Sequence, residues 1–103
     1  MGVSEADSEG FLKDPATWSE QHALAEADRL AIRLTEDHWK IILAAREFYL
    51  NTGVSPSMRP LVNVAKQVEP RLGSSLMLAK LFTSNTSKVV AQLSGTPKPS
   101  DCV

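Results

Sequence analysis

Apolar residues recur at three- and four-residue steps along most of the chain, the spacing that places side chains on one face of a helix. The clearest stretch covers 35–50, and its apolar stripe consists of Trp39, Ile42, Leu43, Tyr49 and Leu50. Thr35 is a suitable N-cap, and Gly53 follows the last apolar position as glycine does where helices end. The pattern therefore predicts an amphipathic helix over 35–50. Arg46 lies on the same stripe, so we expect its stem to pack and its guanidinium to reach the rim.

Four further helices are indicated by capping residues, prolines and glycines around shorter apolar stripes. Asp14-Pro15 is an N-cap followed by proline at the first helical position, and it predicts a helix to about Ala27. The other three predicted helices cover 57–69, 76–82 and a stretch from Asn85 or Thr86 to about Ser94. Pro70 ends the first of these three, and Gly95 ends the last.

Five short helices cannot bury their apolar faces singly, so we expect them to share one core. The fold class predicted is mainly α: a small five-helix orthogonal bundle over 1–94, in which 35–50 and 57–69 form a helix-turn-helix-like core. Residues 10–13 either add one short N-terminal β segment or belong to a disordered tail whose Phe11 and Leu12 contact the core. The predicted core consists of Trp18, Leu24, Trp39, Ile42, Leu43, Tyr49, Leu61, Val64, Val68, Leu78, Leu81, Phe82, Val89 and Leu93.

The last nine residues, Gly-Thr-Pro-Lys-Pro-Ser-Asp-Cys-Val at 95–103, form a segment that we call the C-terminal arm. Its two prolines exclude a helix or a ladder strand, so we expect a flexible arm that packs poorly and reaches about 20 Å. Its Cys102 is the only cysteine of the chain. A thiol displayed in this way suits the transfer of a group between proteins, and the alternative is an inert cysteine near a loose end. Asp101 and the terminal carboxylate disfavour the thiolate, so a partner's pocket should activate it.

Composition and charge exclude several function classes. The 103 residues carry a net charge of −1, which argues against a dedicated nucleic-acid binder, although 51–103 hold six Lys/Arg against two Asp/Glu. A single cysteine excludes an intrachain disulfide and a Cys/His metal cluster, and His22 and His38 lack partners at metal-ligand spacing. We therefore predict no metal and no cofactor. No apolar run approaches the ~18 residues of a membrane span, and no signal peptide is present, so we expect a cytoplasmic protein without a membrane partner.

Several separate motifs resemble, in register, those of the DsrC/TusE family of sulfur-carrier proteins. They are D-S-E-G-F-L-K-D-P-A-T-W-S-E at 7–20, L-T-E-D-H-W at 34–39, S-P-S-M-R-P-L-V at 55–62 and the ending G-T-P-K-P-S-D-C-V. The resemblance implies a small helical bundle with an N-terminal hairpin and a mobile C-terminal arm. It also implies that Cys102 is the catalytic, sulfur-carrying residue. Arg59 and Lys88 match family positions, and with Lys98 in the arm they are the candidates for a partner- or anion-binding surface.

One departure from the family pattern bears on function. Members tied to sulfite reduction have a second cysteine eleven residues before the last one, where this chain has Ala91. The single-cysteine pattern is that of the tRNA 2-thiouridine relay type. The resemblance therefore implies a persulfide carrier, more than an independent enzyme, that relays sulfur towards tRNA 2-thiouridine synthesis. Further departures occur at Leu76, Asn85, Thr96 and Asp101.

The implied partners are a sulfur-donor sulfurtransferase complex of the TusBCD or DsrEFH type and a downstream tRNA thiolase or sulfite reductase. Two alternative functions stay open at this point. One is a DsrC-like partner or regulator in dissimilatory sulfur metabolism. The other is a helix-turn-helix DNA-binding regulator in which Cys102 is incidental; on that hypothesis nucleic acid would be a direct partner.

Overall fold

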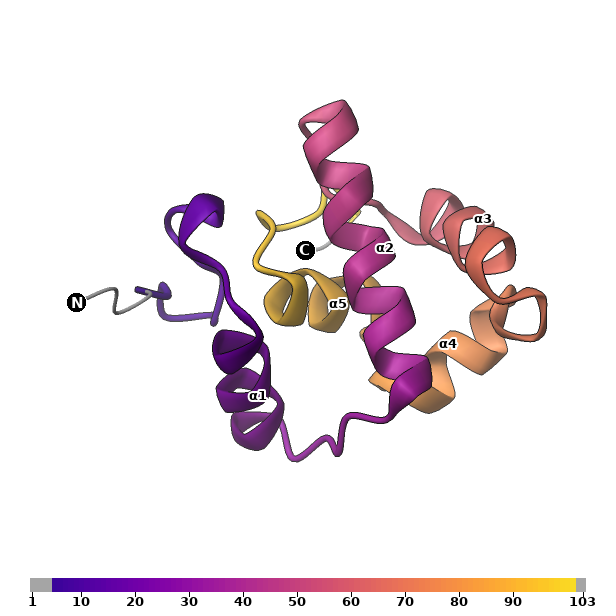
Figure 1. Ribbon diagram of the computed structural model, residues 1–103, viewed down its shortest axis with the longest axis horizontal. Helices are drawn as coiled ribbons and strands as arrows, with labels where there is room; N and C mark the ends of the chain where they lie inside the picture. The colour runs from indigo at the N-terminus through magenta and orange to yellow at the C-terminus, as the bar shows by residue number, and fades with distance from the viewer. Residues whose placement is uncertain (1–4, 102–103) are drawn as a thin grey trace.

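The computed structural model describes residues 5–101, in which five α-helices pack around a shared core (Figure 1). The helices are α1 (Glu20–Arg29), α2 (Glu36–Thr52), α3 (Met58–Val68), α4 (Ser75–Phe82) and α5 (Thr86–Ser94), with short 3-10 turns at Pro15–Thr17 and Pro70–Leu72. Within 5–101 there is no strand, and the expected N-terminal β segment is reduced to an isolated antiparallel bridge between Ala6 and Leu12. The predicted mainly α fold is confirmed.

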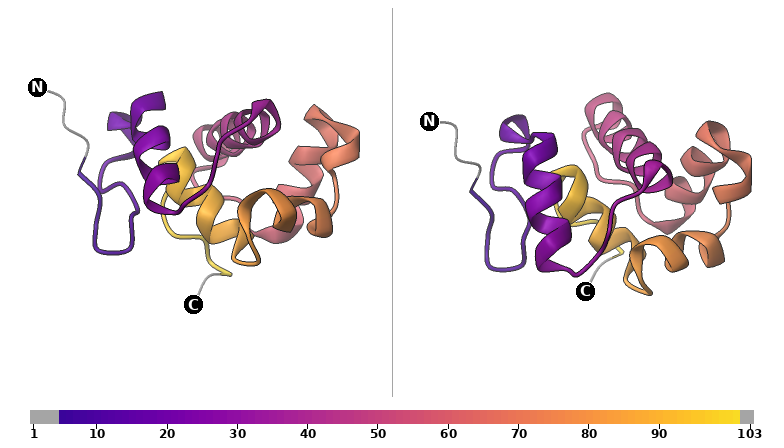
Figure 2. Two further views of the ribbon diagram at one scale, coloured as in Figure 1. Left: turned by 90° about the horizontal axis from the view of Figure 1, so that it is seen from below. Right: turned by 60° about the horizontal axis from the view of Figure 1, so that its bottom comes forward.

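Helix α5 is the centre of the bundle. It contacts the other four helices, and every one of its residues except Lys88 is buried. Figure 2 shows α1 and the N-terminal segment on one side of α5, and α3 with α4 on the other. The sequence indicated only an amphipathic helix here, because the four polar residues on α5 suggested an exposed face. These residues, Thr86, Ser87, Gln92 and Ser94, are instead buried with hydrogen-bond partners, which offset the cost of removing them from water.

The core is confirmed in part. Its largest fully buried apolar side chains are Phe82, Ile41, Ile42, Leu61, Leu72, Leu78, Leu93 and Val90, and Trp18, Trp39 and Leu81 pack against it while partly exposed. Three predicted core residues are wrong: Leu24, Leu43 and Val68 are 53%, 49% and 46% exposed. On α2 the buried face includes Ile41, Ile42 and Ala45, so the stripe that faces α5 is rotated relative to the predicted one.

The predicted helix over 15–27 is two elements. Asp14 caps a 3-10 turn that ends at Thr17, and Trp18 then adopts an extended backbone. A second N-cap, Ser19, accepts a hydrogen bond from the His22 N–H (3.2 Å) and starts α1. The extended residue at 18 places its indole against the end of α5, a contact that no local pattern indicates.

The remaining helix ends follow the predicted signals closely. Thr35 forms a capping box with His38 at the start of α2, and Gly53 ends that helix in the left-handed conformation (φ 81°). The His38 Nε2 atom lies 2.8 Å from the Leu81 carbonyl oxygen, so this buried imidazole is a structural group. None of the helices formed by 5–101 is long and apolar enough to cross a membrane.

Candidate functional site

The site is built around the point where the C-terminal arm leaves α5. The end of a helix leaves carbonyl groups without intrahelical partners, and here side chains from other elements supply donors. The carbonyls of Gln92, Leu93 and Ser94 pair with His22 Nε2, Trp18 Nε1 and Arg46 Nη1 at 3.2, 2.8 and 3.1 Å. The direction in which the arm starts is therefore determined jointly by Trp18, which follows the 3-10 turn, and by side chains of α1 and α2.

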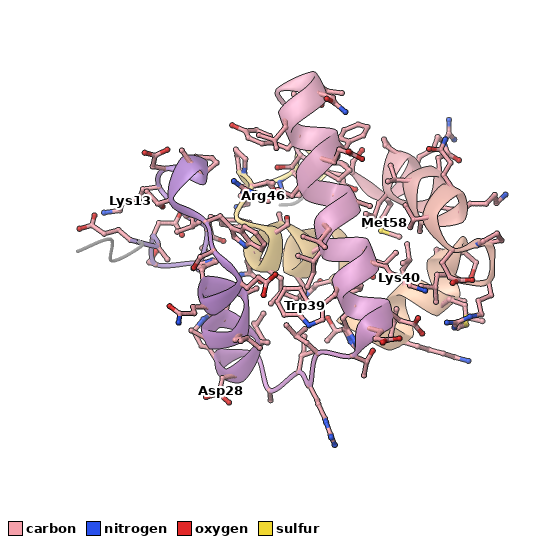
Figure 3. The ribbon with its side chains drawn as sticks, viewed as in Figure 1. Lys13, Asp28, Trp39, Lys40, Arg46 and Met58 are labelled. Carbon is pink, nitrogen blue, oxygen red and sulfur yellow. The ribbon has the colours of Figure 1, made fainter. Side chains whose placement is uncertain are left out.

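The Arg46 guanidinium, which the sequence analysis expected at the rim of the core, is partly buried and binds backbone carbonyls of Ser94 and Pro15. Figure 3 shows Arg46 extending from α2 towards the end of α5. Its guanidinium lies 4.7 Å from the centre of the Trp18 ring and also donates to the Pro15 carbonyl (2.8 Å). Burial lowers the pKa of Arg46 from its ordinary value, yet an arginine remains charged in proteins. Arg46 thus ties the 3-10 turn, α2 and α5 together at the base of the arm.

Gly95 is required at this base for two reasons. Its backbone is left-handed (φ 70°), and a Cβ atom placed there would lie 2.4 Å from Trp18 Cδ1. The first condition favours glycine because other residues clash with their own backbone there. The second excludes any side chain while the indole keeps its position.

The following residues pack on the domain, contrary to the expectation that this segment packs poorly. Thr96 is fully buried, and its N–H donates to the Ala91 carbonyl (3.1 Å). Ser55 Oγ donates to the Pro97 carbonyl, and Pro99 is buried. The described part of the arm therefore has a defined position against the loop before α3, while its flexibility remains a prediction.

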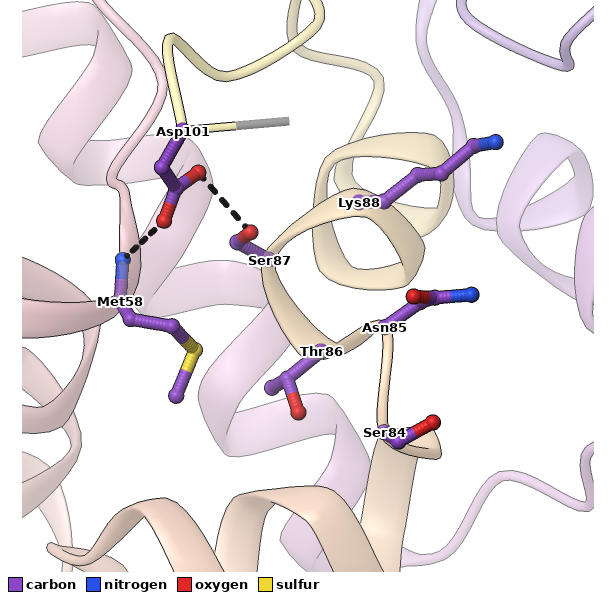
Figure 4. Close-up of a pocket in the computed structure, with 7 residues that line it drawn as sticks. All are labelled: Met58, Ser84, Asn85, Thr86, Ser87, Lys88 and Asp101. Carbon is purple, nitrogen blue, oxygen red and sulfur yellow. Dashed lines mark hydrogen bonds between the residues drawn. The ribbon is translucent and has the colours of Figure 1, made fainter. Parts of the chain in front are cut away.

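Asp101 fixes the last described point of the arm. Its Oδ2 accepts from the Met58 backbone N–H (2.9 Å) and its Oδ1 from Ser87 Oγ (3.0 Å), as Figure 4 shows. Met58 is the first residue of α3, and Ser87 lies in the first turn of α5. Helix N-termini favour negative charge, so the carboxylate occupies a suitable position between two of them. We call this arrangement the Asp101 anchor.

The sequence analysis missed the Asp101 anchor because it considered Asp101 only as a negative neighbour of the thiol. The N-cap residues of both helices, Ser57 and Asn85, make no side-chain capping hydrogen bond. Ser57 and Asn85 are residue types that favour N-caps, so nothing in the sequence indicates that either helix start would take an acceptor from elsewhere. No sequence pattern identifies Asp101 as that acceptor.

A polar hollow of about 340 Å³ lies beside the Asp101 anchor (Figure 4). It is lined by Met58, Ser84, Asn85, Thr86, Ser87, Lys88 and Asp101. A second hollow of about 330 Å³ includes Pro97, Lys98 and Ser100 with Phe48 and Val54. Both hollows include arm residues, so a partner that binds the arm can contact the hydroxyl and amide groups of the first hollow and the apolar groups of the second.

The structure brings two of the three predicted basic residues together. Lys88 Nζ lies 3.6 Å and Lys98 Nζ 3.4 Å from the Glu9 carboxylate, and all three side chains are partly exposed. Arg59 is exposed on α3 and lines a different hollow with Val62 and Asn63. Cys102, predicted to carry sulfur, lies outside the described residues. No group of three or more His, Cys, Asp or Glu within 5–101 could hold a metal ion.

Comparison with protein families gives a match over residues 3–103 to the family model described as DsrC like protein. Among curated proteins, the chain is 38% identical to "Sulfurtransferase TusE" of Buchnera aphidicola (subsp. Acyrthosiphon pisum) over 100 residues, which is 96% of this chain and 88% of that protein. It is 36% identical to "Sulfurtransferase TusE" of Escherichia coli K12, also over 100 residues, 96% of this chain and 92% of that protein.

Two solved structures have the same fold. The NMR structure of Allochromatium vinosum DsrC superposes with a TM-score of 0.86 at 34% identity, covering 97% of this chain and 90% of that one. The crystal structure of the oxidized gamma-subunit of dissimilatory sulfite reductase (DsrC) from Archaeoglobus fulgidus gives a TM-score of 0.80 at 35% identity, covering 97% and 92%. The similarity therefore extends over the whole chain, in sequence as well as in fold.

Proposed function

The chain belongs to the family of DsrC-like proteins, and from this membership we propose that it is a sulfur carrier whose Cys102 accepts sulfur as a persulfide and passes it to an acceptor. One observation carries the proposal: the match to the DsrC-like family model covers residues 3–103, including the arm that holds the single cysteine, and the match to a sulfurtransferase named TusE covers 96% of the chain. The domain, residues 1–94, then serves to present the arm, residues 95–103.

The chemistry is a thiol exchange in which a neutral sulfur atom is transferred from the donor's cysteine to Cys102. The Cys102 thiolate attacks the outer sulfur of the donor's persulfide, the donor's S–S bond breaks, and the donor cysteine leaves as a thiolate. The product is a persulfide on Cys102, and no external oxidant or reductant is consumed. Delivery repeats the same exchange on an acceptor thiol. The chain supplies the nucleophile, and a partner's pocket supplies the activating positive charge.

The destination that we propose is tRNA 2-thiouridine synthesis. The chain has one cysteine, so disulfide or trisulfide chemistry between two arm cysteines is not available within it. The equivalent of the second cysteine position is Ala91, which is buried on α5. The curated relatives cited above are TusE sulfurtransferases, which favours this destination over dissimilatory sulfur metabolism and over a DNA-binding regulator.

The proposed partners are a sulfur-donor complex of the TusBCD or DsrEFH type and a downstream tRNA thiolase, and we place the relay in the reducing cytoplasm, where a thiol stays free. Lys88 and Lys98 are the proposed partner-facing cations beside the arm. Their shared contact with Glu9 is an exposed ion pair, which contributes little and yields readily to a partner's carboxylate. Arg59 is a third proposed contact on the neighbouring surface of α3.

Loading by a persulfide donor tests the proposal. After incubation with a donor sulfurtransferase that carries persulfide, intact-mass measurement should show a gain of about 32 Da, the mass of one sulfur atom, and peptide mapping should place it on Cys102. Cys102→Ser should show no gain, since a hydroxyl cannot form the persulfide. Equal gains in the two proteins would refute the carrier function.

A further inference from the structure

The Asp101 carboxylate connects three parts of the chain that are far apart in sequence. Its two donors, the Met58 N–H and Ser87 Oγ, lie 43 and 14 residues before it. The Met58 N–H belongs to the first turn of α3, where an N–H group has no intrahelical partner, and the second donor is the hydroxyl of Ser87 in the first turn of α5. The next residue after Asp101 is Cys102. A contact that holds Asp101 therefore restrains the point from which the thiol-bearing end of the chain extends.

The contact is of a kind that can open. Asp101 is exposed, so water competes for its carboxylate, and exposed polar contacts of this sort are individually weak. Nearer the base the arm is held differently, since Thr96 is fully buried and Pro99 is buried. The segment thus has a firmly packed base and a polar, reversible attachment at its far end.

We propose that Asp101 is a positioning residue that latches the thiol-bearing end of the arm to the N-termini of α3 and α5. The inference rests on the proposed sulfur-carrier function, for which the thiol must leave the domain and enter a partner's pocket. With the latch closed, Asp101 is held against the starts of α3 and α5. With the latch open, Asp101 is released, and we expect Cys102 to undergo exchange faster. A partner pocket that presents a cation to Asp101 opens the latch by competing for its carboxylate.

Two effects of Asp101 must be separated in any test. As a negative neighbour, its carboxylate disfavours the thiolate whether the arm is held or free. As a latch, it acts only through Met58 and Ser87. Replacing Asp101 removes both effects at once. Ser87→Ala removes a donor to the latch and leaves every charge near the thiol unchanged, so this variant isolates the latch.

The first readout is the alkylation rate of Cys102 by iodoacetamide, a small neutral reagent, measured by intact mass on the folded full chain. Loss of one hydrogen bond to a carboxylate should raise this rate about two- to tenfold in Ser87→Ala. Ser84→Ala, in the same hollow, is the matched control and should alkylate like the wild type. In an Asp101→Ala background, Ser87→Ala should have no further effect.

The second readout is hydrogen exchange of the Met58 amide, followed by NMR. Its N–H donates to Asp101 in the closed latch, so exchange should be faster in Ser87→Ala and in Asp101→Ala, with Asp101→Asn restoring part of the protection through its amide oxygen. The latch would be overturned if Ser87→Ala changed neither the Met58 amide exchange rate nor the Cys102 alkylation rate. It would also be overturned if Ser87→Ala raised the alkylation rate by the same factor in the Asp101→Ala background as in the wild type. Neither readout uses a sulfur donor, so a failure of persulfide loading would refute the proposed function and leave the latch standing.

Discussion

Gly95→Ala should destabilise the protein more than an ordinary substitution of glycine at a helix end. Gly95 ends α5 with φ 70°, and the added methyl carbon would lie 2.4 Å from Trp18 Cδ1 and 2.8 Å from Trp18 Cβ. The indole cannot simply move aside, because its N–H donates to the Leu93 carbonyl and its ring lies under the Arg46 guanidinium. The substitution therefore tests how firmly the base of the arm is built.

Two costs add at this position. A non-glycine residue in the left-handed region costs about 1–2 kcal/mol. Forcing a methyl group against a fixed side chain costs a further ~1–3 kcal/mol. Gly53→Ala is the matched control, since Gly53 also ends a helix with positive φ (81°) and an added Cβ there meets nothing within 4 Å. Gly95→Ala should thus lose about 1–3 kcal/mol more of the free energy of unfolding than Gly53→Ala.

Urea unfolding followed by tryptophan fluorescence and by circular dichroism measures both variants on one scale. The difference should appear as a lower midpoint for Gly95→Ala with an unchanged slope. In a Trp18→Leu background, where the ring is absent, the two glycine substitutions should cost nearly the same. Equal losses for Gly95→Ala and Gly53→Ala in the presence of Trp18 would show that the close contact with the indole does not constrain the arm's base.

Three further predictions concern the same structure. Arg46→Lys should cost about 1–3 kcal/mol in urea unfolding, because an ammonium cannot reproduce the two-pronged hydrogen bonding and ring stacking of the guanidinium. Truncation after Gly95 should lower the melting temperature measurably, because it removes the fully buried Thr96 and its hydrogen bond to the Ala91 carbonyl. Arg71 donates a hydrogen bond that lowers the pKa of Asp37. This stabilisation is fully present above the ordinary carboxyl pKa of about 3.9 and is lost as pH falls through the lower folded-state pKa. Arg71→Gln should therefore lower the melting temperature at neutral pH, by an amount that shrinks as the pH is taken below about 3.9.

The parts of the fold that could be predicted from the sequence are those determined by local chemistry. N-caps and left-handed glycines act within a few residues of themselves, and so the two ends of α2 and the end of α5 agree with the expectation from Thr35, Gly53 and Gly95. The family, likewise, is identified by short motifs that each keep their own spacing.

The parts that could not be predicted depend on tertiary contacts. The residues near Leu43 do not indicate which side of α2 packs in the core. Leu43 is therefore expected to be buried, although the structure leaves it exposed and buries Ile41 and Ile42 instead. The break after Thr17 depends on an indole that hydrogen-bonds a residue 75 positions away. At the candidate site, Cys102 and the nearby lysines stand out by residue type. The Asp101 anchor does not, because its donors are a backbone N–H and a serine from distant helices.

The central claim is that this chain carries sulfur from a donor to an acceptor, and delivery tests it most directly. The protein is loaded on Cys102 with heavy-isotope sulfur, freed of donor, and mixed with a tRNA thiolase and its tRNA in a single turnover. The account predicts that the label leaves Cys102 and appears in 2-thiouridine, with no transfer from a mock-loaded Cys102→Ser protein. Label that stays on the chain, or leaves it equally fast as free sulfide whether or not the acceptor is present, would contradict the account.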